Sequence, residues 1–152
     1  MGDVYSVTGR QDVTTATPGD TSLTLNGVTT TRGRVKEWTI STGGTPADNA
    51  IQWLARRHSA SGTGTAVSTI AENDLDGPAA LIAAEEDHTV EPTYTAGGEL
   101  FDNFLNQRAT YRWVATPNGE WLVPATSDAG VGWTAFHASY TGSAEVSASW
   151  AE

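Results

Sequence analysis

The feature that most constrains this chain is a series of short segments in which apolar and polar residues alternate, separated by turns rich in Gly, Pro, Asn and Asp. Helix-length runs of Ala, Leu, Glu and Lys are missing, whereas Thr, Ser and Gly are abundant. Alternation with a period of two is typical of a strand, because successive side chains of a strand point to opposite faces. The sequence therefore predicts an all-β protein.

Two of these segments divide cleanly into two faces. Residues 34–40 and 50–56 are each expected to form a strand, and the second segment places Ile51, Trp53 and Ala55 on one side. Such a strand has one face for a core and one for solvent.

The strongest turn signal is the dipeptide Asn118-Gly119, which tolerates the positive φ angles of a type I′ turn. It predicts a hairpin between residues 110–116 and 120–123. The predicted register divides the side chains between two faces, one with Tyr111, Trp113, Ala115 and Leu122, the other with Arg112, Val114, Thr116, Trp121 and Val123. Because both faces carry large apolar groups, we expect a second sheet to cover one and a loop or partner to cover the other.

The remaining segments complete the predicted architecture. Residues 144–150 alternate, so the chain ends in a packed strand, and residues 23–28 contain a second Asn-Gly pair that predicts a weaker hairpin. Residues 71–109 are acidic, and we expect a long loop with one short element, a helix over 79–86 or another strand. Strands without helix-length crossovers favour a jelly-roll-like β-sandwich over a βαβ fold.

The length of 152 residues fits one domain, 1–152, in which residues 1–32 are either a hairpin or an arm. Six Trp residues are available for a core, and zero Cys excludes disulfides and thiolate metal sites. No stretch approaches the roughly 20 apolar residues of a membrane span, so no membrane partner is expected.

Charge is distributed unevenly along the chain. Residues 1–60 carry a net charge of +1 and residues 61–152 carry −11, which gives −10 overall. Binding to duplex DNA or RNA requires a dense basic surface that releases counterions. The acidic net charge therefore argues against nucleic acid as the partner and favours a protein.

No arrangement of residues predicts catalysis. The three histidines, His58, His88 and His137, are far apart and match no metal-binding spacing, and no GxSxG motif marks a nucleophile. Residues 73–77 resemble the start of a calcium loop, but with Glu72 as the first position the twelfth is Ala83, which lacks the required carboxylate. We interpret them as a solvated acidic turn, with a looser Ca²⁺ site as the alternative. The prediction is a protein that is not an enzyme and has no cofactor or metal site.

Basic residues gather in the first part of the chain. If they lie on neighbouring strands, they form a compact positive patch. This patch is either a solvated face or a docking surface for an acidic partner. The partner-binding candidates, to which one aromatic residue is added, are Arg32, Arg34, Lys36, Arg56, Arg57 and Trp121.

Several stretches resemble small proteins encoded among the head genes of tailed bacteriophages. The resemblance extends over about residues 33–152, and residues 1–32 have no counterpart. It is carried by residues 44–50 (GTPADNA), 88–95 (HTVEPTYT), 105–115 (LNQRATYRWVA), 124–126 (PAT) and 140–142 (YTG).

This resemblance is to capsid decoration, or cement, proteins, and it implies a β-sandwich or jelly roll that binds the major capsid protein on the outer surface of the virion, as a trimer. A second hypothesis is a carbohydrate-binding module in which Trp121, Trp133 and Tyr140 stack on sugar rings. A small esterase or lyase is poorly supported, because no acid/base pair is visible.

Overall fold

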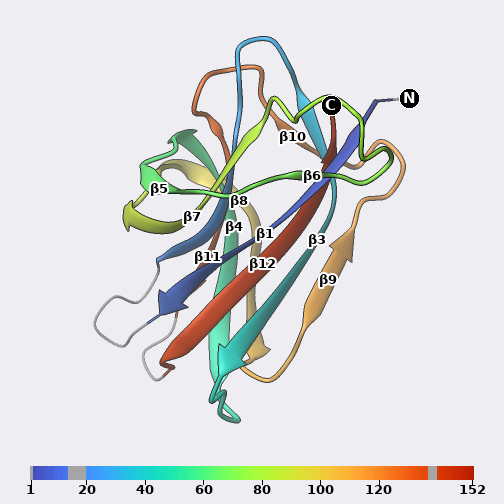
Figure 1. Ribbon diagram of the computed structural model, residues 1–152. Helices are drawn as coiled ribbons and strands as arrows, with labels where there is room; N and C mark the ends of the chain where they lie inside the picture. The colour runs from blue at the N-terminus through green and yellow to red at the C-terminus, as the bar shows by residue number, and fades with distance from the viewer. Residues whose placement is uncertain (1, 14–19, 137–139) are drawn as a thin grey trace.

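The computed structural model describes residues 2–13, 20–136 and 140–152, and in these ranges it contains strands and no helix (Figure 1). Two antiparallel sheets pack face to face, which confirms the predicted β-sandwich. The strands are β1 (Val4–Val13), β2 (Thr21–Asn26), β3 (Gly33–Gly44), β4 (Ala50–Ala60), β5 (Thr63–Ala66), β6 (Ile70–Ala71), β7 (Ala83–Val90), β8 (Thr93–Asn106), β9 (Tyr111–Val114), β10 (Trp121–Val123), β11 (Gly130–Phe136) and β12 (Gly142–Ala151).

The strand order is that of a jelly roll. Sheet A has the order β10-β3-β12-β1-β6, with β9 also paired to β3, and sheet B has the order β5-β7-β2-β11-β4-β8. The pairs are nested: β1 pairs with β12, β2 with β11, β3 with β9 and β10, and β4 with β8. This is the pattern of one long hairpin rolled into two sheets. The strands β5, β6 and β7 are an insertion at the tip of that hairpin, between β4 and β8.

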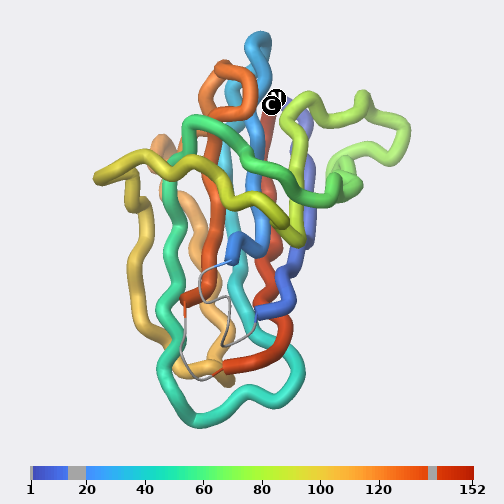
Figure 2. Tube along the Cα trace, turned by 90° about the vertical axis from the view of Figure 1, so that its left-hand side faces the viewer, coloured from blue at the N-terminus to red at the C-terminus, as the bar shows by residue number. Residues whose placement is uncertain are grey.

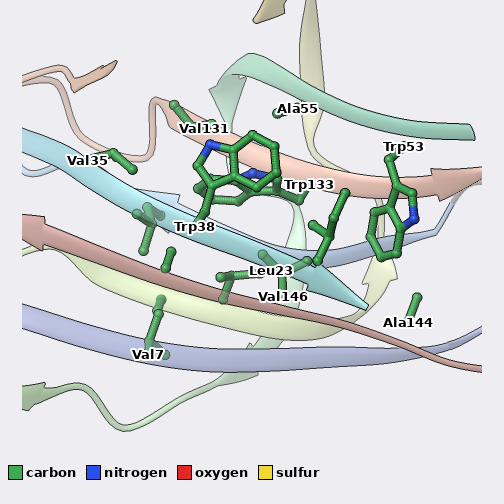
Figure 3. Close-up of a cluster of buried hydrophobic side chains, with 14 of the residues drawn as sticks. Val7, Leu23, Val35, Trp38, Trp53, Ala55, Val131, Trp133, Ala144 and Val146 are labelled. Atoms are coloured by element: carbon green, nitrogen blue, oxygen red, sulfur yellow. The ribbon is translucent and has the colours of Figure 1, made fainter. Parts of the chain in front are cut away.

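Both alternating segments and the C-terminal segment form strands as predicted. They lie within β3, β4 and β12. Alternate residues of β4 and β12 are buried, whereas in β3 the alternation shifts by one residue between Val35 and Glu37. The core between the sheets is built from aromatic and branched side chains (Figure 3). Trp38 is at its centre, with ring contacts to Trp133 from the opposite sheet. Burial of such side chains contributes about 1.5 to 3 kcal/mol each.

The hairpin predicted around Asn118-Gly119 is wrong. β9 pairs with residues 37–40 of β3 and β10 pairs with residues 33–35, so the two lie end to end along one edge of β3. The amide of Gly119 donates to the carbonyl of Thr116 at 2.8 Å, and the positive φ of 65° belongs to Asn118. These features define a type II turn. Pro117 fixes a negative φ at the first central position of the turn, and Asn118 adopts the positive φ that a type II turn requires at the second.

The pairing with β3 also changes which side chains of residues 111–123 face the core. Trp121 stacks on Trp113 with 4.5 Å between ring centroids, so both point to the core side and pack near Trp38. Val123 is buried on the same side, and Val114 is the exposed apolar side chain of the outer face. The expectation that both faces need a cover is therefore wrong.

Three further expectations are corrected. Residues 71–109 are mostly strand rather than loop, because β7 and β8 occupy 83–90 and 93–106. Residues 23–28 lie in β2 and the segment after it, and β2 pairs with β7 and β11 rather than with a following strand. Within residues 1–32, β1 and β2 belong to different sheets.

The insertion projects from one end of the sandwich. The tube along the chain shows residues 70–82 extending beyond β1 near the two termini (Figure 2). No helix in the described ranges is long and apolar enough to cross a membrane.

Candidate functional site

The outer face of sheet A is an open surface of hydroxyl groups and charges. Along β12 the even-numbered residues from Ala144 to Trp150 are buried, so the odd-numbered residues point outward. Pairing aligns these with β1 and β3 in three rows, which are Ser6–Ser149–Glu37, Thr8–Ser147–Thr39 and Arg10–Glu145–Ser41. Nested pairing thus brings together residues from the two ends of the sequence.

A trough of about 620 Å³ crosses this face at the end where β1 begins and β12 finishes. Loop 72–77 of the insertion lies on one side of the trough, and the segment 115–120, which connects β9 to β10, lies on the other. We call it the outer trough, and its lining residues are Val4, Lys36, Glu37, Glu72, Asn73, Val114, Ala115, Pro117, Glu120 and Ser149. A smaller depression of about 250 Å³ shares Glu37, Glu72 and Ser149 with it and extends it over the hydroxyl rows.

Two ion pairs hold charged side chains of this face in place. Both Glu37 carboxylate oxygens accept hydrogen bonds from the Arg112 guanidinium, at 2.6 Å each. These bonds and the positive charge of Arg112 hold the pKa of Glu37 below its usual value, against the opposing effect of burial. Arg10 pairs with Glu145 at 3.3 Å. A carboxylate that is ionised and accepts two hydrogen bonds is held in position as an acceptor and is a poor proton donor.

Loop 72–77 and the residues after it are fastened to the body by hydrogen bonds. The Glu72 amide donates to the Val4 carbonyl at 2.8 Å, and the Tyr5 hydroxyl donates to the Pro78 carbonyl at 3.0 Å. The Glu152 carboxylate accepts from the amides of Leu81 and Ile82, each at 2.9 Å, and from the Trp150 indole at 3.0 Å.

The predicted basic patch is divided by the fold. Arg34 and Lys36 are exposed on β3 in sheet A, and Arg32 precedes them, whereas Arg56 and Arg57 lie on β4 in sheet B. Because β3 and β4 are in different sheets, the five residues do not form one compact surface.

Arg56 and Arg57 are engaged in the fold itself. The Arg56 guanidinium lies 3.7 Å from the centroid of the Tyr94 ring and donates to Thr134 Oγ1 at 3.2 Å. Arg57 Nη1 donates to the Leu122 carbonyl at 2.9 Å and so connects sheet B to sheet A. Both have structural roles that the linear sequence did not reveal.

The aromatic residues considered for sugar stacking lie in the core. Trp133 and Tyr140 are almost fully buried, and Trp121 is half-buried against Trp38 and Trp113. The Tyr140 hydroxyl donates to the carbonyls of Gly43 and Ser143. An exposed platform for a sugar ring is therefore not provided by these three residues.

Two histidines are buried in sheet B. His88 lies between the Thr24 hydroxyl and the Thr21 carbonyl, at 3.4 and 3.2 Å from its ring nitrogens. Burial lowers the pKa of His58 to about 4, an effect that nearby backbone groups partly oppose. His137 lies outside the described residues, and among the described ones no group of three or more His, Asp or Glu side chains could hold a metal ion.

The outer trough was missed by sequence reasoning. Its floor comes from β3 and β12 and its sides from two loops that are distant in the chain, so no local motif marks it. The available signal was the repeated hydroxyl and carboxylate pattern opposite the apolar positions of 143–149. This arrangement suits binding through hydroxyl, carboxylate and apolar contacts.

Comparison with protein-family models, with curated proteins and with solved structures found no match to this chain.

Proposed function

We propose that this protein is a non-catalytic decoration protein of a tailed-phage head, which binds the major capsid protein on the outer surface of the virion. The jelly-roll topology carries the proposal, because this architecture recurs in viral capsid proteins. The resemblance of residues 33–152 to head-gene products adds the specific role. A packed body with fastened loops suits a protein that reinforces a shell.

The distribution of charge supports a protein partner. The net charge is −10, and the exposed basic residues include Arg32, Arg34 and Lys36. They are retained as docking candidates, whereas Arg56 and Arg57 are withdrawn because their side chains hold the fold together. Assembly as a trimer stays part of the proposal on the resemblance, whereas the doubly apolar hairpin that predicted a loop or partner over its second face is absent.

A carbohydrate-binding function is the second candidate. The observation that favours it is the hydroxyl and carboxylate surface of the outer trough, because sugar hydroxyls bind such groups. The burial of Trp133 and Tyr140 removes the stacking platforms that would raise the affinity for a glycan.

The test is binding of the purified protein to undecorated shells assembled from the major capsid protein of a tailed phage. We expect saturable binding to shells and a trimeric mass by light scattering. A strictly monomeric mass, no binding to shells and a positive signal on a glycan array would overturn the proposal in favour of the second candidate.

A further inference from the structure

Large apolar side chains gather on the exposed loop of the insertion, residues 70–82, which we call the apolar loop. Six large apolar residues are exposed in the described part of the chain, and Ile70, Leu75 and Leu81 belong to this loop. Leu75 is 91% exposed, the highest value among them. A neighbouring depression of about 280 Å³ is lined by Tyr5, Pro78 and other residues near the termini.

The apolar loop is ordered although its side chains lack a cover. The bonds from Glu72, Tyr5 and Glu152 fasten it on both sides of Leu75. Within it, Asp74 accepts from the amides of Asp76 and Gly77, each at 3.0 Å. A side chain presented in a fixed position loses less conformational entropy when a partner binds it.

Carboxylates surround Leu75. Glu72, Asp74 and Asp76 are exposed, and in the ranges that the structure describes no Lys or Arg forms an ion pair with any of them. A surface that buries Leu75 must therefore place these three charges beside its own groups. Lysine or arginine residues around an apolar pocket would complement them, whereas an anionic membrane surface or nucleic acid would repel them.

We infer that the apolar loop is the element that docks on the capsid shell, with Leu75 entering an apolar pocket of the major capsid protein that is rimmed by Lys or Arg. This inference rests on the proposed function and names the surface that performs it. Arg34 and Lys36, which are exposed on β3, form the competing docking surface.

The experiment compares four variants for binding to the undecorated shells. Leu75→Ser should weaken binding about 10- to 100-fold, the loss expected when a buried leucine contact is removed. Phe104→Ser is the matched control, because Phe104 is 69% exposed on β8, at the edge of sheet B, and should leave binding unchanged. The variant E72K/D76K should bind more slowly, because reversed charges repel a basic rim, and it keeps the Asp74 side chain that accepts from the Asp76 amide.

Unfolding temperatures check that each variant is folded, and Leu75→Ser should match the wild type because its side chain is exposed. If the wild type binds shells and Leu75→Ser binds equally well, the inference is wrong while the proposed function stands. Loss of binding in R34E/K36E, with Leu75→Ser unaffected, would assign docking to β3 instead. Leu75-dependent binding to vesicles of phosphatidylserine and phosphatidylcholine would assign the loop to a membrane and overturn the inference. A wild type that binds no shell would refute both proposals.

Discussion

His58 should make the stability of this protein depend on pH between neutrality and pH 5. It is 3% exposed, and burial lowers its pKa from 6.5 to about 4 in the folded protein. The groups that face it include His88 and the backbone of Leu25, Asp128 and Val131. As the pH falls through 6.5, the unfolded chain binds a proton that the folded protein does not yet accept, so stability present above pH 6.5 is lost until the pH approaches 4.

The size of this effect follows from the two pKa values. Between pH 7 and pH 5 the linkage amounts to about 2 kcal/mol of unfolding free energy, which for a domain of this length is a fall in Tm of about 4 to 8 °C. At pH 5 carboxylates with ordinary pKa values are still mostly ionised, so their contribution is small in this window.

The assay is urea unfolding at pH 7 and pH 5, followed by the fluorescence of the six Trp residues. The control is His58→Gln, which removes the titrating group. Its stability at pH 7 is expected to be lower, but its loss between the two pH values should be smaller than that of the wild type by about 2 kcal/mol. Equal losses in the two proteins would refute the reasoning, because they would place the proton uptake elsewhere.

Three further substitutions test the packing and the turns. Gly132→Ala should lower stability by about 1 to 3 kcal/mol, because the added Cβ would lie 2.5 Å from the Tyr94 hydroxyl. Gly43→Ala is the control and should be tolerated, because its Cβ would lie 3.8 Å from the nearest atom. Thermal unfolding compares the two variants. Asn118→Val should cost about 1 to 2 kcal/mol because a β-branched residue disfavours positive φ, and an Asn118→Gly variant with the same loss would contradict the type II assignment. Glu152→Ala should cost about 1 kcal/mol and speed hydrogen exchange of the Leu81 and Ile82 amides, and unchanged exchange would show that the carboxylate does not fasten the loop.

Local pattern predicted the strands whose two faces differ strongly. The segments within β4 and β12 alternate between core and outer residues, so their period identifies them, whereas in β3 the alternation shifts by one residue between Val35 and Glu37. For β7 a strand was one of two alternatives beside a helix, because its sequence, AAEEDHTV, is rich in Ala and Glu, which have low strand propensity. Its pairing with β2 and β5 overrides that propensity through tertiary contacts.

The error at Asn118-Gly119 has a different cause. The dipeptide marks a turn correctly, but Pro117 before it selects a type II turn, and the partner of both flanking segments is β3, more than 70 residues earlier in the chain. The outer trough could not be predicted for a related reason, since its residues meet only when the first and last strands pair. The exposure of Leu75 was equally hidden, because an isolated apolar residue in an acidic segment has no periodicity to interpret.

The central position of β12 in sheet A has a consequence for synthesis on the ribosome. This last strand lies between β1 and β3, so while the chain is being made neither of them has its main partner. At about 5 to 20 residues per second, the inward side chains of Val7, Val35 and Trp38 are made several seconds before Val146 and Trp150 can cover them. Sheet A therefore completes only after β12 has left the ribosome, and the unpaired edges of β1 and β3 are the surfaces that a chaperone would have to protect until then.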